Sequence, residues 1–363
     1  MKPFYDPLKS YEENYANGTY GDFANPKSLP TQTSDATLFD IPVNSLFGIP
    51  AGPLINAKFC QGAFQNGFDI NIYKTVRSRN YPCHPFPNTL AVKISGDLTM
   101  ELAEKPLVAE AKFDTAQLSI SNSFGVPSKD PEIWQADMSQ ARAAAGQGQI
   151  LIGSFQGTRP ENKSDDVAYI ADHVTTAKLV VETGVPALEL NLSCPNEGTN
   201  NLLCFDTELV VRIISAIKDA IGDVPLLLKM AYFKCQDTLE TFIKKTQNIV
   251  QGYAAINTIP ARLVDESGNQ ALPGEGRAVS GVCGAAITWA GLEMTQRLAE
   301  IRATNDYNFL ICGVGGVSKP CDYFKFRQSG ADFVMSATGA MFNPGLAQDI
   351  KRELVCHPDA KQH

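Results

Sequence analysis

Short apolar runs alternate with longer amphipathic segments along most of this chain. The apolar runs lie near residues 46–51, 70–75, 118–122, 150–155, 187–192, 226–230, 254–258, 309–313 and 333–337. Apolar residues recur at helical spacing in the segments 164–183, 207–221, 239–252 and 290–304. Short apolar strands that alternate with amphipathic helices predict βα units and a parallel sheet.

The nine predicted strands exceed by one the eight that a (β/α)8 barrel needs. The run 118–122 follows the run 70–75 with no clear crossover helix between them, so we assign it to an insertion over the barrel mouth. The remaining eight predict an α/β protein with the TIM-barrel fold. The glycine-rich stretch 261–280 is expected to be a surface loop.

The first part of the chain has no such alternation. We predict an irregular N-terminal arm over residues 1–40, followed by one catalytic barrel domain over residues 41–363. The arm contains four tyrosines and is more aromatic than a free tail, so it is expected to pack on the rest of the molecule; these are Tyr5, Tyr11, Tyr15 and Tyr20.

Composition narrows the kind of ligand. The 363 residues are 44% hydrophobic and 19% charged, as in soluble globular proteins, and their formal net charge is −8. This acidic balance, without a dense basic cluster, argues against nucleic acid or an anionic membrane as partner and favours small molecules. The chain also has no apolar run of about 18 residues, so no membrane-spanning helix is expected.

The cysteines and histidines of the chain bear on its cellular location and on metal binding. The nine cysteines include no C-x-x-C pair and the chain begins with a polar stretch, which predicts a reducing, cytoplasmic location. Iron–sulfur and zinc sites need several thiolates at short spacing, and the four histidines form no ligand cluster in the sequence. No metal is therefore expected.

The most informative motif is the hexapeptide Asn191-Leu192-Ser193-Cys194-Pro195-Asn196 at the end of an apolar run. Chemistry in parallel α/β proteins collects at the carboxyl ends of the strands. The thiol of Cys194 can act as a base or nucleophile, and the amides of Asn191 and Asn196 offer donors and acceptors to a planar polar ring. The alternative is that Cys194 is a buried structural cysteine.

Two lysines, Lys74 and Lys229, also end apolar runs. A buried ammonium without a partner is costly, so each is expected to face a ligand anion or an electron-rich ring, or else to pair with a carboxylate. Polar residues at further strand ends, Asn122, Asn257 and Thr258, add amides and a hydroxyl to the same face. The resulting set of neutral amides suits a flat heterocycle.

The last two strands end in glycine-containing turns, Gly313-Val314-Gly315-Gly316 and Ser336-Ala337-Thr338-Gly339. Backbone amides at such turns can bind phosphate without a basic residue, and the last two strands of a TIM barrel are a common place for this. The two turns therefore predict a phosphate site.

Together these residues resemble the dihydroorotate dehydrogenase family, whose members are FMN-dependent (β/α)8 barrels of pyrimidine synthesis. The resemblance runs from about Leu46 to Gly345, and the Asn-Leu-Ser-Cys-Pro-Asn element is its most specific part. Soluble class 1 members use a cysteine base and membrane-associated class 2 members a serine, so Cys194 and the polar arm resemble class 1. The resemblance implies oxidation of dihydroorotate to orotate for UMP synthesis, with Cys194 as base and hydride transfer to FMN, in a cytoplasmic homodimer.

The resemblance assigns roles to residues of this chain. Cys194 and Lys74 are expected to be catalytic. Substrate contacts are expected from Lys74, Asn122, Phe124, Gly125, Val126, Asn191, Asn196, Asn257 and Thr258. FMN contacts are expected from Ala51, Gly52, Lys74, Thr75, Asn122, Asn191, Lys229, Ser280, Gly281, Gly315, Gly316, Thr338 and Gly339.

Some features depart from the family pattern. The final phosphate turn of the family usually reads Gly-Thr, whereas Thr338-Gly339 reverses the order. The arm and the segment 77–112 are longer than in compact class 1 chains. The related pyrimidine-reducing domain of dihydropyrimidine dehydrogenase typically has histidine where this chain has Asn196, so that residue favours dihydroorotate.

The electron acceptor is open at this stage. Fumarate acts directly in one class 1 branch, and NAD acts through a separate iron–sulfur flavoprotein subunit in another. The chain lacks the cysteines for such a cluster, so an NAD route needs a partner, and fumarate is the expected acceptor. Two other hypotheses are a flavin barrel acting on another pyrimidine or an enone, and a flavin-binding scaffold without enzymatic activity.

Overall fold

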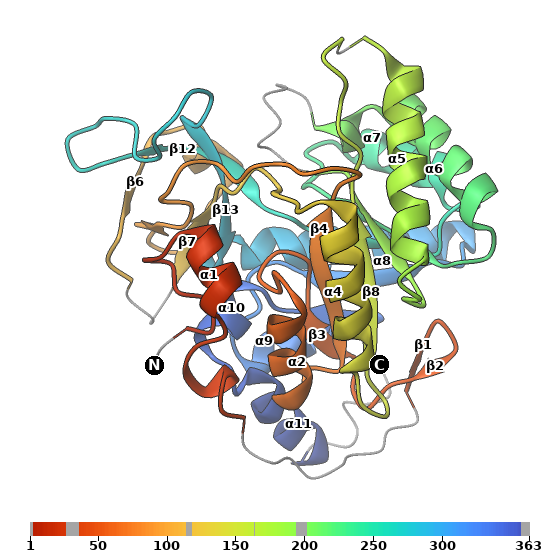
Figure 1. Cartoon of the computed structure of the whole chain (residues 1–363), viewed down its shortest axis with the longest axis horizontal. Coiled ribbons are helices and arrows are strands. Elements are labelled where there is room, and N and C mark those ends of the chain that lie inside the picture. The colour runs from red at the N-terminus through yellow and green to blue at the C-terminus, as the bar shows by residue number, and fades with distance from the viewer. Residues whose placement is uncertain (1–2, 27–35, 114–117, 163, 194–201, 357–363) are drawn as a thin grey trace.

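A closed barrel of eight parallel strands forms the centre of the molecule (Figure 1). The computed structural model describes residues 3–26, 36–113, 118–162, 164–193 and 202–356. In order round the barrel the strands are β3 (Phe47–Ile49), β4 (Ile70–Val76), β8 (Ile150–Phe155), β9 (Leu188–Asn191), β10 (Leu226–Met230), β11 (Gly252–Ala255), β14 (Leu310–Val314) and β15 (Phe333–Met335). The predicted TIM barrel and its eight predicted strands are confirmed.

Helices cover the outside of the barrel. The longer ones are α2 (Ala57–Gln65), α4 (Pro131–Ala143), α5 (Asp166–Val181), α6 (Thr207–Ile221), α7 (Gln236–Thr246), α8 (Thr288–Asn305), α9 (Pro320–Gln328) and α11 (Leu346–Cys356). In α6 the side chain of Asp206 caps the first turn, and Leu209, Ile213 and Ile217 lie at helical spacing on the buried face. Helix α7 ends earlier than predicted because Gly252 already begins β11.

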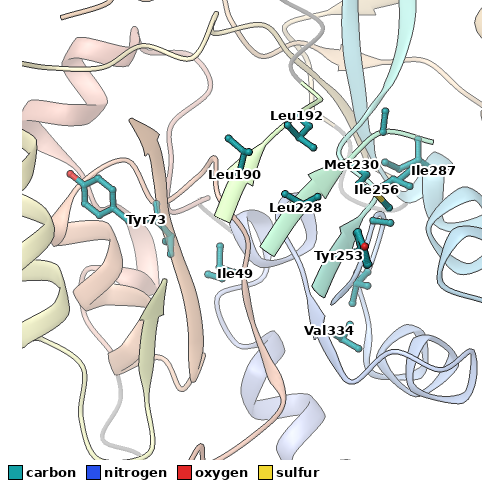
Figure 2. Packing of buried hydrophobic residues seen from close by; sticks show 14 of the residues in the cluster. Ile49, Tyr73, Leu190, Leu192, Leu228, Met230, Tyr253, Ile256, Ile287 and Val334 are labelled. Atoms are coloured by element: carbon teal, nitrogen blue, oxygen red, sulfur yellow. The ribbon is translucent and has the colours of Figure 1, made fainter. Parts of the chain in front are cut away.

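Alternation along each barrel strand divides its side chains between two cores. Leu188, Leu190 and Leu228 belong to the layer between the strands and the helices, and Figure 2 shows Leu190 and Leu228 side by side on β9 and β10. Ile72 and Leu227 face the barrel axis instead. The inner core is closed at the amino-terminal end of the strands by residues of the hairpin β1 (Thr37–Leu38) and β2 (Ile41–Pro42).

A second, smaller closed barrel is built from two insertions. It consists of β5 (Ala91–Val92), β6 (Leu107–Glu110), β7 (Ser119–Asn122), β12 (Ile259–Val264) and β13 (Val279–Gly284), with the short helix α3 (Met100–Ala103). The assignment of 118–122 to an insertion is confirmed, since β7 pairs with β13 and β5 and not with the large barrel. The prediction of a surface loop over 261–280 is confirmed only for the middle of this range. Its ends lie in β12 and β13, where residues alternate between buried and exposed.

The N-terminal arm contains helix α1 (Tyr11–Asn17), which lies near β7 and the short helix α10 (Thr338–Phe342) (Figure 1). Tyr5 and Tyr11 are buried, which confirms that the arm packs on the rest of the molecule. Its division from the barrel domain at residue 40 stays a prediction. Within the described ranges, no helix combines the length and the apolar character needed to cross a membrane.

Candidate active site

The barrel strands place polar side chains on the inner face at their carboxyl ends. Side chains two residues apart share one face of a strand, and Ile72, Ala187 and Leu227 all face the barrel axis. Two residues further along each strand come Lys74, Glu189 and Lys229, all less than 9% exposed. The sequence-predicted lysines are therefore buried inside the barrel.

A cavity opens at this end of the barrel. The predicted site residues that line it are Ala51, Gly52, Lys74, Thr75, Asn122, Phe124, Gly125, Val126, Asn191, Lys229, Asn257, Thr258 and Thr338. They come from loops after β3 and β11, from the strands β4, β9 and β10, from the segment that begins at the end of β7, and from α10. Two further predicted site residues, Cys194 and Asn196, lie outside the described residues.

Five predicted cofactor residues do not line this cavity within the described chain, namely Ser280, Gly281, Gly315, Gly316 and Gly339. Gly281 lies behind the cavity wall, because a Cβ atom added there would be 2.3 Å from Oγ1 of Thr258. Gly315 and Gly316 follow Val314, which does line the cavity, and both have positive φ angles that favour glycine. Their turn thus borders the cavity beside Thr338.

Lys229 and Glu189 are two ionisable side chains inside the barrel. Burial raises the pKa of Glu189, whereas the positive charge of Lys229 and a hydrogen bond from Ser154 lower it. The hydroxyl of Ser154 donates to Oε1 of Glu189 at 3.1 Å and lies 3.0 Å from the hydroxyl of Thr75. The other carboxylate oxygen, Oε2, is buried and has no hydrogen-bond partner among the described residues. A buried acceptor beside a cavity points to a donor on a ligand.

Two amides of the predicted site meet around Ser193, the residue before Cys194. Nδ2 of Asn257 donates to the hydroxyl and to the main-chain oxygen of Ser193, at 3.0 and 3.2 Å. Oδ1 of Asn191 accepts from the main-chain N–H of Ser193 at 3.3 Å, and Nδ2 of Asn191 donates to Gln156 at 2.9 Å. These bonds tie the end of β9 to the residues that follow β8 and β11.

The loop after β7 is held by two buried arginines. Arg77, 1% exposed, donates through Nε to the carbonyl of Val126 at 3.0 Å. Arg277, 3% exposed, donates to the carbonyl and to the hydroxyl of Ser123, both at 3.1 Å. Val126 has a positive φ of 56°, which is unfavourable for a β-branched residue, so the loop needs such bonds to keep its conformation.

Comparison with known proteins decides the family. The dihydroorotate dehydrogenase family model matches residues 103–356, more than half of the chain. A protein of Dictyostelium discoideum named dihydroorotate dehydrogenase is 31% identical over 358 residues, covering 95% of this chain and 96% of that protein. This chain belongs to the dihydroorotate dehydrogenase family. It is an oxidoreductase of the flavin-dependent kind that this family comprises.

Shorter matches link the chain to bacterial members of the family. Two catalytic subunits named dihydroorotate dehydrogenase B (NAD(+)) are 28% identical in Bacillus pumilus and 27% identical in Staphylococcus carnosus. Each match covers 52% of this chain, and 57% and 58% of the respective bacterial protein. The Dictyostelium protein is therefore similar over nearly the whole length of the chain, and the bacterial subunits over about half of it.

The cavity suits a flavin, the cofactor class of the family. A flavin ring carries N–H donors, carbonyl acceptors and a large apolar area. The phosphate of a flavin nucleotide needs hydrogen-bond donors. The cavity supplies the buried acceptor of Glu189, the ammonium group of Lys229 and the hydroxyl of Thr338, with apolar walls that include Ile120 and Ile256. No group of three or more potential metal ligands occurs among the described residues.

Several cavity residues were missed from the sequence, namely Tyr5, Tyr11, Glu189 and Cys283. Glu189 could have been recognised in the sequence, because a charged residue inside an apolar strand indicates a buried polar function. Cys283 places a thiol at the cavity. Burial raises its pKa to about 11, although the hydroxyl of Thr338, 3.4 Å from Sγ, lowers it. A thiol with this pKa stays protonated at neutral pH and makes a poor base.

Proposed function

We propose that this protein oxidises (S)-dihydroorotate to orotate in de novo pyrimidine (UMP) biosynthesis, with FMN bound in the cavity. One observation carries the proposal: the buried lysines Lys74 and Lys229 line one cavity with the amides of Asn191 and Asn257. These two amides bond to Ser193, directly before Cys194. Membership of the dihydroorotate dehydrogenase family supports the same reaction.

FMN, when bound, accepts the hydride that leaves C6 of the substrate. In our proposal its ring lies against Ala51, Gly52, Lys74, Thr75 and Lys229, and its phosphate lies at the turn of Gly315, Gly316, Thr338 and Gly339. Ser280 and Gly281 are proposed as further contacts of the FMN site, and Gly281 leaves room for the side chain of Thr258, which lines the cavity. Lys229 supplies a fixed positive charge that attracts electron density to the adjacent ring edge.

The substrate is assigned to the other polar groups of the cavity. The loop of Asn122, Phe124, Gly125 and Val126 receives the carboxylate and ring edge, and Asn191, Asn196, Asn257 and Thr258 pair with the amide-like groups of the ring. Cys194 removes the proton from C5. A thiol suits this task because its ordinary pKa is close enough to neutrality for a modest local field to populate the thiolate.

A substrate comparison tests the assignment. The purified protein, loaded with FMN, is assayed with dihydroorotate and with dihydrouracil, which lacks the carboxylate, and orotate or uracil is measured as product. Dihydroorotate is expected to be favoured in kcat/KM by at least about 100-fold, since a site built for polar pairing rejects analogues that leave its groups unpaired. A preference for dihydrouracil would replace our proposal by a dihydropyrimidine dehydrogenase-like activity.

Fumarate is the proposed electron acceptor. It is a small dicarboxylate, and the groups that receive the carboxylate of dihydroorotate can also receive one of its carboxylates. The second candidate is NAD, reached through a separate iron–sulfur flavoprotein subunit, which the names of the bacterial relatives favour. Anaerobic reduction with dihydroorotate followed by mixing with either acceptor separates the two. Prompt reoxidation by fumarate, with orotate as competitor, supports our choice. Reoxidation only with a flavoprotein partner and NAD contradicts it.

A cytoplasmic homodimer remains our prediction for the state of the protein in the cell. Light scattering on the purified protein tests the dimer, and fractionation of the source cells tests the location. A monomer or a membrane-bound pool would correct the respective prediction.

A further inference from the structure

The N-terminal arm has a defined structure of its own. Helix α1 begins with a capping box in which Ser10 and Glu13 bond to each other's backbone. Asn14, which is fully buried, accepts a hydrogen bond from the N–H of Asp6 at 2.8 Å and donates to the carbonyls of Asp6 and Ser10, both at 2.9 Å. These bonds fold the arm back on itself, so its aromatic side chains have fixed positions.

The arm is also fastened to three parts of the barrel domain. The N–H of Phe4 donates to the carbonyl of Met341 in α10 at 3.0 Å. Nδ2 of Asn56, the residue before α2, donates to the carbonyl of Tyr15 at 2.9 Å. Ahead of α4, the ammonium group of Lys129 lies 2.6 Å from the carboxylate of Glu12. The arm is therefore a built part of this end of the barrel.

Two tyrosines of the arm reach the cavity itself. Tyr5 and Tyr11, 3% and 4% exposed, both line it together with Phe124. The ring of Phe124 meets Tyr5 edge-to-face, with centroids 5.8 Å apart and planes at 85°. It meets Tyr11 in the same way at 6.2 Å and 66°. Aromatic pairs prefer this geometry, in which the positive edge of one ring faces the negative face of another.

The position of Phe124 governs the loop that carries it. Asn122 precedes Phe124 in this loop, and Gly125 and Val126, both with positive φ angles, follow it. The carbonyl of Phe124 accepts from the N–H of His84 at 3.0 Å, which fixes its backbone. The two tyrosine rings pack on its side chain, so the loss of these rings removes contacts that position the side chain of Phe124 at the cavity.

We infer that Tyr5 and Tyr11 are positioning residues for the substrate, acting through Phe124 to hold the loop that receives the carboxylate and ring edge of dihydroorotate. The inference rests on the proposed function. It assigns the arm to the active site, although the arm and the loop that carries Phe124 lie far apart in the sequence. The hydroxyl groups of the tyrosines are not required, because the contacts to Phe124 are made by the rings.

The test measures binding of orotate to the FMN-loaded protein by the change in flavin absorbance. Tyr5→Leu and Tyr11→Leu should each raise the Kd about three- to tenfold, the range expected from one aromatic pair, and together by at least about tenfold. Tyr5→Phe and Tyr11→Phe keep the rings and should stay within about twofold of the unmodified protein. KM for dihydroorotate should follow the Kd, while kcat and FMN content change little.

Phe23→Leu is the matched control. Phe23 belongs to the same arm, is 1% exposed and stacks on Phe4 at 4.2 Å, and it does not line the cavity. Its loss should lower Tm and leave the Kd for orotate within about twofold. Equal weakening by Phe23→Leu, or unchanged binding in both Tyr→Leu variants, overturns the inference. An unmodified protein that retains FMN and does not bind orotate overturns the proposed function and the inference with it.

Discussion

The guanidinium group of Arg277 donates to both the carbonyl and the hydroxyl oxygen of Ser123, each at 3.1 Å. The same group donates to the carbonyls of Pro85 at 2.6 Å and Pro87 at 2.9 Å. One buried side chain from the loop before β13 thus ties together two other loops, one of which carries Asn122 and Phe124. The shape of the proposed substrate loop depends on this arginine.

Arg277→Lys should therefore damage substrate use. A lysine keeps the charge but cannot make the planar set of hydrogen bonds, and each buried carbonyl left unpaired costs about 1–3 kcal/mol. We expect KM for dihydroorotate to rise at least about tenfold, with a smaller change in kcat. Arg262→Lys, at an exposed position of the same hairpin, is the control and should leave both constants unchanged. Equal kinetics for the two variants would show that Arg277 does not shape the substrate loop.

A buried histidine should make stability depend on pH. Burial lowers the pKa of His173 to about 4, against a hydrogen bond to the carbonyl of Tyr169 that raises it. The unfolded chain binds the proton near pH 6.5 and the folded chain only near pH 4, so stability is fully present above pH 6.5 and is lost as pH falls towards 4.

From pH 8 to pH 5 this one group should lower the free energy of unfolding by about 2 kcal/mol. Urea unfolding of the protein and of His173→Gln at both pH values measures it, because glutamine can keep the bond to Tyr169 and does not titrate. The free energy of unfolding of the unmodified protein, taken relative to that of His173→Gln, should be about 2 kcal/mol lower at pH 5 than at pH 8. A difference that does not change with pH contradicts the shifted pKa.

The buried charges of Lys229 and Glu189 should act in opposite directions on bound FMN. A positive charge near the ring favours its electron-rich form and a negative charge disfavours it. Lys229→Gln should lower the midpoint potential, and Glu189→Gln should raise it, each by about 30 mV or more, which is tenfold for a two-electron couple. Spectroelectrochemical titration measures both. Shifts of the same sign would mean that these residues do not flank the ring.

Two thiols of the chain should differ in their effect on catalysis. Cys194→Ser should retain FMN and slow its reduction by dihydroorotate at pH 7 by at least about 100-fold, because a positioned base typically contributes 10²–10⁴-fold. Part of the rate should return at high pH. Cys283→Ser changes a thiol that lines the cavity and has a raised pKa, so it should slow the reaction less than about fivefold. The reverse order of effects would assign the base to Cys283.

Much of this architecture could be predicted from the sequence because it follows local patterns. Apolar runs marked all eight barrel strands, and polar residues at their ends, such as Lys74, Asn191 and Lys229, marked the cavity. The small barrel was not predicted beyond β7. Strands as short as Ala91–Val92 have no periodicity to detect, and their pairing depends on segments far apart in the chain.

The missed site residues have a similar explanation. Tyr5 meets Phe124, and Arg277 meets Ser123, through contacts between segments that are far apart in the chain. Nothing in the local sequence of the arm or of the glycine-rich loop indicates these contacts. Glu189 is different, because its place between Leu188 and Leu190 was a visible signal for a buried polar function.

The most direct test of the account is an anaerobic titration of the FMN-loaded protein with dihydroorotate. Absorbance of the oxidised flavin is recorded after each addition, and orotate is quantified in the same samples. We expect bleaching that is complete near one equivalent per bound FMN, with one orotate formed for each flavin reduced. If the protein holds FMN and is reduced by dithionite, but keeps its oxidised spectrum in excess dihydroorotate, it does not oxidise dihydroorotate.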